Sequence, residues 1–352
     1  MGMKKAFNVL ITIILLLVIS NISYAVDYQI SEDIEKQGCN ISYNGKIVLV
    51  TSINGRAYIS KDGEEWETHG TPYFSNHSLV WDGEKYAVFT CRGNVYFSND
   101  GIEWELKESS NLSDFAYEEI DEDTKKVLLI KEVIWTGKRF IGCNSNSARF
   151  FSSNDGIVWE DNGNAEGAED NYSWRQFHTI ASNGEITVAG GNSGRTAVSY
   201  DGVTWKDTSY TMEDITLKYN DEACFEKIIW TGDKFIAIGN LGRGACGEER
   251  NIIFSSEDGC TWKEIRAQKG RSEFENIMWN GSQVIVLGKK YTPPNEKGQS
   301  SVDHSYILSS SDLINWEKTI ISEKYIRKMT LVDNKIIAIG YALVSIKNIP
   351  DN

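Results

Sequence analysis

The amino-acid sequence predicts an all-β protein, a β-propeller in which seven four-stranded blades surround a central axis. Three observations predict this fold. A turn motif, Ser-x-Asp-Gly-x-x-Trp, recurs at intervals of roughly 40–50 residues along most of the chain. A second turn, typically Trp-x-Gly, precedes most copies and runs into a short apolar segment. Between the turns the chain has the pattern of four short strands in each repeat, which is the content of one propeller blade.

Each copy of the first motif combines residue types that close a tight turn. The Asp carboxylate accepts backbone N–H bonds, Ser does the same more weakly, and Gly supplies a positive φ that a side chain resists. The Trp begins the next strand and buries a large ring. The six aspartates are Asp62, Asp100, Asp155, Asp201, Asp258 and Asp312. Leu313 replaces the glycine in the last copy, so we expect a different turn or strain there.

The blades follow one another along the chain. The full turn motif occurs in six of them, at residues 37–70, 79–107, 132–161, 177–208, 227–266 and 275–321. In the fifth blade we expect strands at Lys227–Trp230, Phe235–Gly239, Asn251–Ser255 and Thr261–Ile265. Residues 325–347 supply three further strands without the motif, at Met329–Val332, Lys335–Gly340 and Leu343–Ile346.

The seventh blade then lacks one strand. Propellers commonly close when one terminus completes the blade formed by the other, because this leaves no open sheet edge. The segment Tyr28–Ser31 could supply the missing strand. A six-bladed ring, with the C-terminal strands packed outside it, is the alternative.

The repeated turns resemble those of the BNR, or Asp-box, repeat propellers, the superfamily that includes the sialidases. The resemblance covers about residues 37–347, although each box here is one residue shorter between Asp and Gly than the usual family box. The family uses this turn structurally, so the resemblance implies the fold rather than an activity. The family's Phe/Tyr-Arg-Ile-Pro motif is absent, and Tyr325-Ile326-Arg327 does not match it. We therefore predict a non-catalytic member, with a sialidase-like glycoside hydrolase as the alternative.

Residues 1–25 have the features of a secretory signal peptide. Lys4 and Lys5 form a basic start, an apolar stretch runs from Val9 to Ile19, and Ser23-Tyr24-Ala25 is a cleavage site. An uncleaved N-terminal anchor is the alternative. We expect a single propeller domain over residues 26–352, secreted or otherwise outside the cytoplasm, with no integral membrane span after cleavage.

The charge of the chain restricts the classes of binding partner that we expect. The chain has 36 Lys and Arg against 50 Asp and Glu, a formal net charge of −14. An acidic surface disfavours nucleic acid and anionic membranes as partners. We expect a glycan or an extracellular protein instead.

Loop lengths indicate which face of the ring carries function. Both repeated turns are short and fall on one face, whereas the long insertions fall in the other two connections and share the opposite, long-loop face. The insertions are residues 107–131, 161–176, 206–226, 240–250 and 289–305. Variable loops on a rigid scaffold are frequent binding sites. The sequence therefore predicts a binding module that uses the long-loop face.

Trp174 is the tryptophan that neither repeat position explains. It lies beside Tyr172 and Arg175 and could form an aromatic platform for a sugar ring or a protein side chain, or could anchor its own loop. The predicted ligand-binding residues are Trp174, Tyr172, Arg175, Arg243, Arg250 and Tyr291. A scaffold or assembly role, as in the photosystem II assembly propellers with similar repeats, is a further alternative.

We predict no catalytic residue, metal or cofactor. The acidic run Asp121-Glu122-Asp123 lacks the spacing of a calcium loop, and Asp303-His304 has no partnered nucleophile.

Six cysteines suit an oxidising compartment without proving disulfides. Cys224 and Cys246 both fall on the long-loop face and could form a disulfide. Cys39 and Cys91 could pair across adjacent blades, whereas we expect Cys143 and Cys260 to be thiols.

Overall fold

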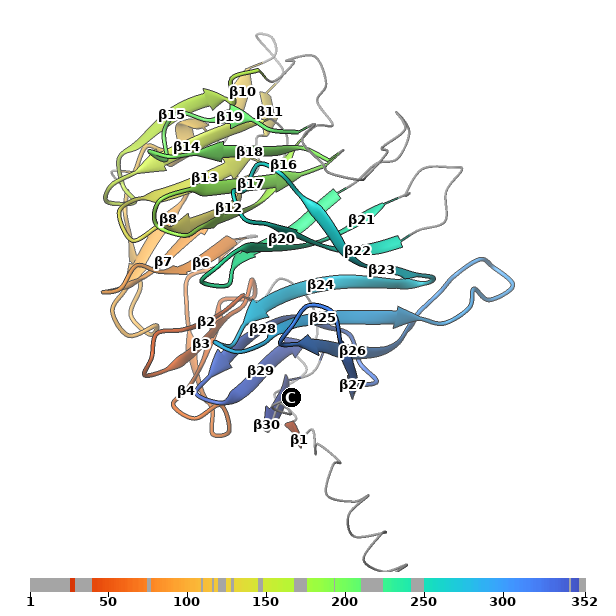
Figure 1. Ribbon diagram of the computed structural model, residues 1–352. Helices are drawn as coiled ribbons and strands as arrows, with labels where there is room; N and C mark the ends of the chain where they lie inside the picture. The colour runs from red at the N-terminus through yellow and green to blue at the C-terminus, as the bar shows by residue number, and fades with distance from the viewer. Residues whose placement is uncertain are drawn as a thin grey trace, which may run out of the picture.

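Seven four-stranded antiparallel sheets stand around one axis in the computed structural model (Figure 1). The structure describes residues 26–28, 40–74, 77–108, 110–115, 117–119, 125–127, 130–144, 148–167, 176–192, 194–209, 224–241, 250–341 and 343–347. The innermost strand of each blade contacts that of the next blade, and the seventh contacts the first, so the ring is closed. The prediction of a seven-bladed propeller is confirmed, and the six-bladed alternative is wrong.

The strands of each blade run in sequence order from the axis outward, apart from the last strand of the seventh blade. The innermost strands are β2 (Asn40–Tyr43), β6 (His77–Trp81), β12 (Ile130–Trp135), β16 (Phe177–Ser182), β20 (Cys224–Trp230), β24 (Ser272–Trp279) and β28 (Ile326–Val332). The second strands are β3 (Val48–Thr51), β7 (Tyr86–Thr90), β13 (Phe140–Asn144), β17 (Thr187–Gly191), β21 (Phe235–Leu241), β25 (Val284–Tyr291) and β29 (Lys335–Gly340).

The outer half of each blade is shorter in some blades than in others. The third strands are β4 (Arg56–Ser60), β8 (Val95–Ser98), β14 (Arg149–Ser153), β18 (Thr196–Ser199), β22 (Arg250–Ser256), β26 (Val302–Ser310) and β30 (Leu343–Lys347). The outermost strands are β5 (Glu67–Gly70), β9 (Glu105–Leu106), β15 (Trp159–Asn164), β19 (Lys206–Asp207), β23 (Lys263–Lys269), β27 (Glu317–Ser322) and β1 (Val26–Tyr28). A small hairpin, β10 (Tyr117–Glu119) and β11 (Lys125–Val127), follows a 3₁₀ turn at Leu112–Phe115.

Both ends of the chain complete the seventh blade. Strand β1 pairs antiparallel with β30, so that Val26 lies opposite Ser345 and Tyr28 opposite Leu343. The predicted closure by an N-terminal strand is confirmed, but the strand begins at Val26 and not at Tyr28. The register of so short a strand is set by its partner, which the sequence pattern of the segment itself does not reveal.

The repeated turns owe their shape to two side chains. In the turn of blade one, the carboxylate of Asp62 accepts the N–H groups of Glu64 and Glu65 at 2.8 and 3.0 Å. The hydroxyl of Ser60 accepts the N–H of Gly63 at 2.8 Å. These backbone hydrogen bonds to the ionised carboxylate lower the pKa of Asp62 below its usual value. The same bonds recur at the other five aspartates.

Asp201 shows the electrostatic consequence most clearly. Partial burial opposes its charge, but hydrogen bonds from the N–H groups of Val203 and Thr204, at 2.8 and 2.7 Å, outweigh this effect. The pKa of Asp201 is lowered to about 2. The charged form of this side chain is therefore part of the folded turn.

The last copy keeps the same turn although it lacks the glycine. Leu313 adopts a φ of 62°, and its N–H still donates to the Ser310 hydroxyl at 2.9 Å. Asn315 adds a side-chain bond from Nδ2 to Asp312 at 2.8 Å. The expectation of strain is therefore met by a leucine in the left-handed region, held there by the surrounding hydrogen bonds.

The core consists of apolar layers between neighbouring blades. Between blades four and five, for example, Val188 packs with Phe225 and Trp262, and none of the three is exposed. The Phe150 and Trp205 rings stack at 3.7 Å between centroids on blades three and four. Second strands such as β7 and β17 are buried at every position, because both faces of each sheet are covered.

Two connections between blades fold over the outer part of the next blade. Fully buried Phe74 packs edge-on against Tyr96 and Trp104 of blade two. Asn111 accepts the Trp159 N–H at 2.7 Å and donates to the Trp159 carbonyl at 3.0 Å, which caps the outermost strand of blade three. These contacts cover sheet edges that would otherwise present unpaired backbone groups.

Candidate functional site

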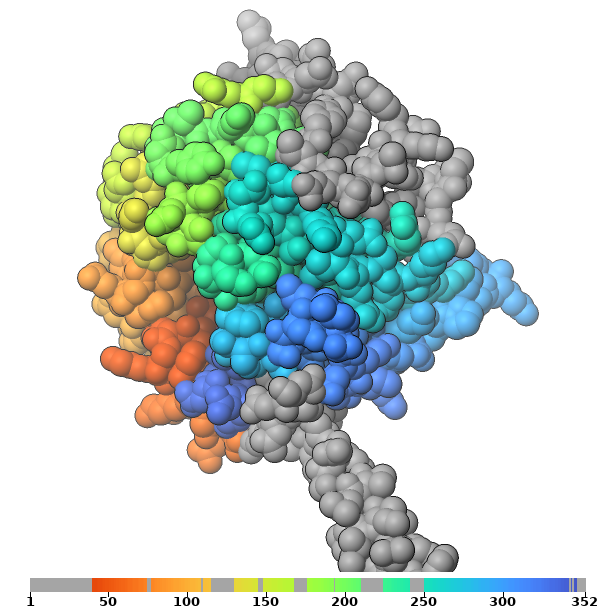
Figure 2. All heavy atoms as spheres, in the orientation of Figure 1, coloured from red at the N-terminus to blue at the C-terminus, as the bar shows by residue number. Residues whose placement is uncertain are grey.

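The two kinds of turn share one face of the ring, and the longer connections lie on the other. This follows from the strand order, because antiparallel neighbours alternate the face on which they turn. On the long-loop face, the hairpin of β25 and β26 carries its tip, residues 292–301, beyond the body of the ring (Figure 1). Figure 2 shows this tip standing out from the molecular surface. A short turn at Gly270 and Arg271 connects blade five to blade six.

Five consecutive blades carry a β-bulge at the long-loop end of the innermost strand. In blades three to seven the pairing with the second strand shifts there and leaves one residue extra. The corresponding strands of blades one and two pair without a shift. A bulge bends its strand and re-aims the extra side chain. We name the five extra residues, Lys131, His178, Glu226, Glu275 and Arg327, the bulge rim.

Charge is distributed unevenly along the bulge rim. Exposed cations lie at its two ends, Lys131 on blade three and Arg327 on blade seven. The three blades between them present half-buried His178, Glu226 and Glu275. Burial lowers the pKa of His178, so this imidazole is neutral at pH 7. The rim therefore offers cationic ends and an anionic centre.

The three central rim residues each contact a residue near the end of the second strand of the same blade. The Nε2 atom of His178 lies 2.7 Å from Asn192 Oδ1, and Asn240 Nδ2 donates to Glu226 at 3.2 Å. Cys224 joins the two blades, because its thiol lies 3.2 Å from Asn192 Oδ1 and 3.5 Å from Glu226. A continuous polar chain thus crosses from blade four to blade five.

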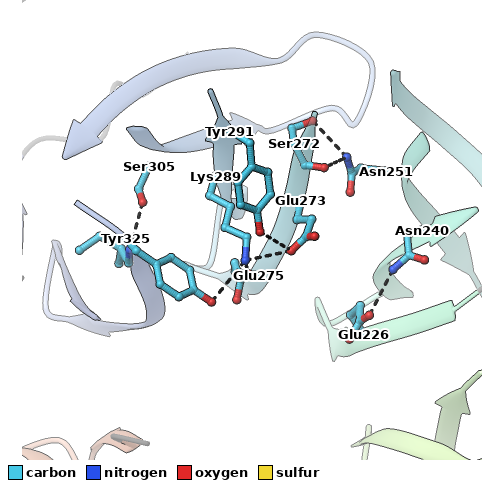
Figure 3. Close-up of polar contacts among 11 residues, drawn as sticks. Glu226, Asn240, Asn251, Ser272, Glu273, Glu275, Lys289, Tyr291, Ser305 and Tyr325 are labelled. Carbon is cyan, nitrogen blue, oxygen red and sulfur yellow. Dashed lines mark hydrogen bonds and ion pairs between the residues drawn. The ribbon is translucent and has the colours of Figure 1, made fainter. Parts of the chain in front are cut away.

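On blade six the same position is occupied by an ion-pair cluster (Figure 3). The Lys289 side chain is only 8% exposed, forms an ion pair with Glu275 and lies 2.9 Å from Glu273. Tyr291 donates its hydroxyl to Glu273 at 3.1 Å, and the Tyr325 hydroxyl lies 3.4 Å from the Lys289 ammonium. Burial opposes the charge of Lys289, but Glu275 and Glu273 raise its pKa above the usual value. Two carboxylates share this one cation.

A second ring of polar side chains lies one residue further along the innermost strands and fixes the blades to one another. Glu132 of blade three accepts the Ile180 N–H of blade four at 2.9 Å and forms an ion pair with Lys227 of blade five. Thr179 likewise accepts the N–H of Ile228 at 3.0 Å. Lys328 contacts Asn40, which joins the seventh blade to the first. The floor beneath the bulge rim is thus held by direct bonds between blades.

The structure places two of the predicted ligand-binding residues. Tyr291 belongs to the Lys289 cluster, where burial raises its pKa. Arg250 begins β22, opposite Leu241 and Lys269, and no contact in the described part joins it to Tyr291. The other four, Trp174, Tyr172, Arg175 and Arg243, lie outside the described residues. Their role stays a prediction.

The predicted disulfide is not present in the described part of the chain. Cys224 keeps its thiol, which is directed at Asn192 and Glu226, and Cys246 lies outside the described residues. Cys91, Cys143 and Cys260 are also thiols. Burial raises the pKa of Cys143 and of Cys260, as expected for thiols in apolar surroundings.

The bulge rim is not among the predicted site residues, although the sequence carries a signal for it. Each rim residue follows an apolar residue and precedes another polar residue at the start of its strand, as in Phe225-Glu226-Lys227 and Phe274-Glu275-Asn276. Two adjacent polar residues interrupt the alternation of a regular strand, which is what a bulge permits.

No group of three or more metal-ligating side chains that could hold an ion occurs among the residues described. Within the same residues, no helix has the length and apolarity to cross a membrane.

No family model and no curated protein sequence matches this chain. Solved propeller structures do match. A structure of YCF48 bound to D1 peptide is similar with a TM-score of 0.60 and 12% identity, over 93% of this chain and 96% of that one. The propeller domain of Cps50 (Swd1) from Myceliophteria thermophila gives a TM-score of 0.57 at 10% identity, over 92% and 100%. YCF48 from Cyanidioschyzon merolae gives 0.50 at 14%, over 71% and 79%. At such identities the likeness shows the fold.

Proposed function

We propose that the protein is a binding module that holds a segment of another protein against the bulge rim on its long-loop face. The observation that carries this proposal is the run of five consecutive bulges, which turns side chains of both charges toward one mouth of the ring. A rigid scaffold with mixed charge suits a polypeptide, because a peptide offers carbonyls, amides and charged side chains together.

The second ring of polar side chains, beneath the bulge rim, favours a binding site over an open channel through the ring. Glu132 of blade three forms an ion pair with Lys227 of blade five and so spans blade four. Thr179 of blade four forms a hydrogen bond with blade five. Side chains held in this way lose little further freedom when a ligand arrives. The similar YCF48 structure contains a bound D1 peptide, which shows that a propeller of this shape can hold a peptide in that protein.

A glycan is the second candidate ligand, and it rests on the long-loop residues Trp174 and Tyr172. A role in assembling other proteins would use the same face, and it differs from the first proposal only in its partner.

We also propose that the protein acts outside the cytoplasm after removal of residues 1–25. Detection of a mature N-terminus at Val26 in the extracellular or envelope fraction would test this point.

A sialidase-like hydrolase fits the described site less well. That chemistry needs a tyrosine that ionises as a nucleophile beside a glutamate. Tyr291 does contact Glu273, but burial raises the pKa of Tyr291. Lys289 also forms an ion pair with Glu273. The pair therefore has the geometry of a structural hydrogen bond. Release of a fluorogenic sugar from a sialoside by the purified protein would contradict this interpretation.

The test of the proposed function compares two variants, in which charged residues are replaced by glutamine, on a displayed random-peptide library and a glycan array. The rim variant combines Lys131→Gln, Glu226→Gln and Arg327→Gln. Its matched control, Lys61→Gln with Glu185→Gln, changes exposed residues on the short-turn face. Peptides selected by the wild type should bind the rim variant at least about tenfold more weakly, because charge-assisted hydrogen bonds are lost.

The control variant should keep the affinity of the wild type. Equal affinity of all three proteins for the selected peptides would refute the bulge rim as the site. Selection of glycans alone, with binding lost in Trp174→Ala, would replace the peptide by a sugar as the ligand.

A further inference from the structure

Four basic side chains gather on the flank of the ring, between blades five and six and apart from the bulge rim. Arg266 comes from β23 of blade five. Lys290, His304 and Lys318 come from β25, β26 and β27 of blade six. We name these four residues the flank cluster. The strand register places Lys290 directly opposite His304 on neighbouring strands.

Fully buried Tyr306 lies at the centre of the flank cluster. The Lys318 ammonium lies 3.8 Å from the centroid of the Tyr306 ring, and the His304 ring lies 6.0 Å from it. Gln268 of blade five donates to the Tyr306 hydroxyl at 2.9 Å. Arg266 lies 5.8 Å from the neighbouring Trp316 ring. The two blades thus bring the four side chains together around Tyr306 and Trp316.

Two side-chain nitrogens of the flank cluster have no hydrogen-bond partner. The Nε atom of Arg266 and the Nε2 atom of His304 are buried and make no hydrogen bond. The ion pairs found among the described residues do not include Arg266, Lys290 or Lys318. Burial lowers the pKa of Lys318, and so does the positive charge of Lys290, because like charges repel. Unpaired buried donors and repelling cations are both costly unless an anion joins them.

Such a gathering of cations is unexpected in a chain with a net charge of −14. Acidic side chains are abundant, and one of those described, Asp303, contacts the cluster. It accepts a hydrogen bond from His304 Nδ1 at 2.8 Å, and a doubly protonated imidazole would also present an Nε2–H donor.

We propose that the flank cluster is a binding site for a tetrahedral oxyanion, a sulfate or phosphate group, between blades five and six. The two ammonium groups and the Arg266 Nε–H would donate to its oxygens, with His304 as a further donor when protonated. The group could be a free anion or part of a sulfated polymer. A dianion would offset the repulsion between Lys290 and Lys318, which a neutral ligand would not.

The test measures thermal unfolding of the full chain with sodium sulfate or sodium chloride at equal ionic strength. The site variant combines Lys290→Met and Lys318→Met, which keeps the apolar stems. The matched control, Lys263→Met, removes an exposed cation from β23. Sulfate should raise the Tm of the wild type and the control by about 2–3 °C more than that of the site variant.

Equal Tm shifts in the three proteins would overturn the proposal, because sulfate would then act on the surface in general. A second measurement identifies the source of the anion. Binding of immobilised dextran sulfate, absent with dextran and reduced at least tenfold in the site variant, assigns a polymer. A Tm shift specific to the site without polymer binding assigns the free anion, and both results support the site.

Discussion

Replacement of Lys289 by methionine provides a direct test of the ion-pair cluster on blade six. The substitution keeps the length of the stem but leaves Glu275 and Glu273 without their shared cation. Removing one partner of a fully buried pair costs about 3–5 kcal/mol. Glu275 is 16% exposed and Glu273 34% exposed, so water partly replaces the lost cation. We therefore expect a loss of about 2–3 kcal/mol in the free energy of unfolding.

Urea denaturation at pH 7 and 25 °C measures this loss. Because the folded protein raises the pKa of Lys289, its contribution is complete at pH 7 and is lost only as the pH rises above about 10. The difference between wild type and variant should therefore be constant from pH 7 to 9. At acid pH it should shrink, because the two carboxylates left without a cation take up protons.

Two further variants decide whether charge is the cause. Lys290→Met removes the adjacent lysine, whose side chain faces blade five, and should change the free energy of unfolding little. Lys289→Met combined with Glu273→Gln and Glu275→Gln removes the whole set of charges and should recover most of the loss. A single Lys289→Met variant as stable as the wild type would refute the assignment of this cluster as a buried, charge-paired site.

Four other substitutions test the turns and the blade edges. Gly63→Ala should destabilise the protein by about 2 kcal/mol, because a Cβ there would lie 2.4 Å from a neighbouring side chain and φ is 75°. Gly83→Ala, with open space around it, should cost only about 1 kcal/mol, and equal losses would contradict the close approach. Asn111→Ala should lower stability by about 1–2 kcal/mol and speed hydrogen exchange at the Trp159 amide; unchanged exchange would show that Asn111 does not cap that strand. Asp201→Asn should be less stable than the wild type at pH 7, by a difference that disappears as the pH falls from above 4 through about 2; a constant difference would mean that the carboxylate charge is not the cause.

The fold could be predicted because its repeating signal is local. An Asp that accepts two backbone N–H groups within three residues shapes its turn without help from distant parts of the chain. Five glycines at the same turn position adopt positive φ, as the motif requires. Six such turns define six blades, and the apolar second strands indicate that each sheet is covered on both faces. The closing strand β1 was harder to place, because its register depends on β30.

The candidate site could not be predicted to the same degree, because bulges depend on two strands at once. Glu226 is displaced from regular pairing only because Phe225 and Lys227 are bonded to adjacent residues of β21. A single sequence shows the two polar residues but not which partner they face. Tyr291 was found from its place in a long insertion, yet it lies on a regular strand whose length the sequence did not reveal. The ion pairs of Lys289 join neighbouring strands of blade six, and the flank cluster forms between blades five and six, so neither follows from the sequence around one residue.

Both proposed sites involve blades five and six, and strand length explains why. Strands β20 to β23 have 7 residues each, and β24, β25 and β26 have 8, 8 and 9, whereas the first three strands of blades one and two have 4 or 5. The added length carries Lys289, Lys290 and Tyr291 beyond the level at which the shorter blades end. Because successive residues of a strand face opposite sides, Lys289 turns to the blade-seven side and Lys290 to the blade-five side. One extension of regular strand thus supplies a cation to each of two separate sites.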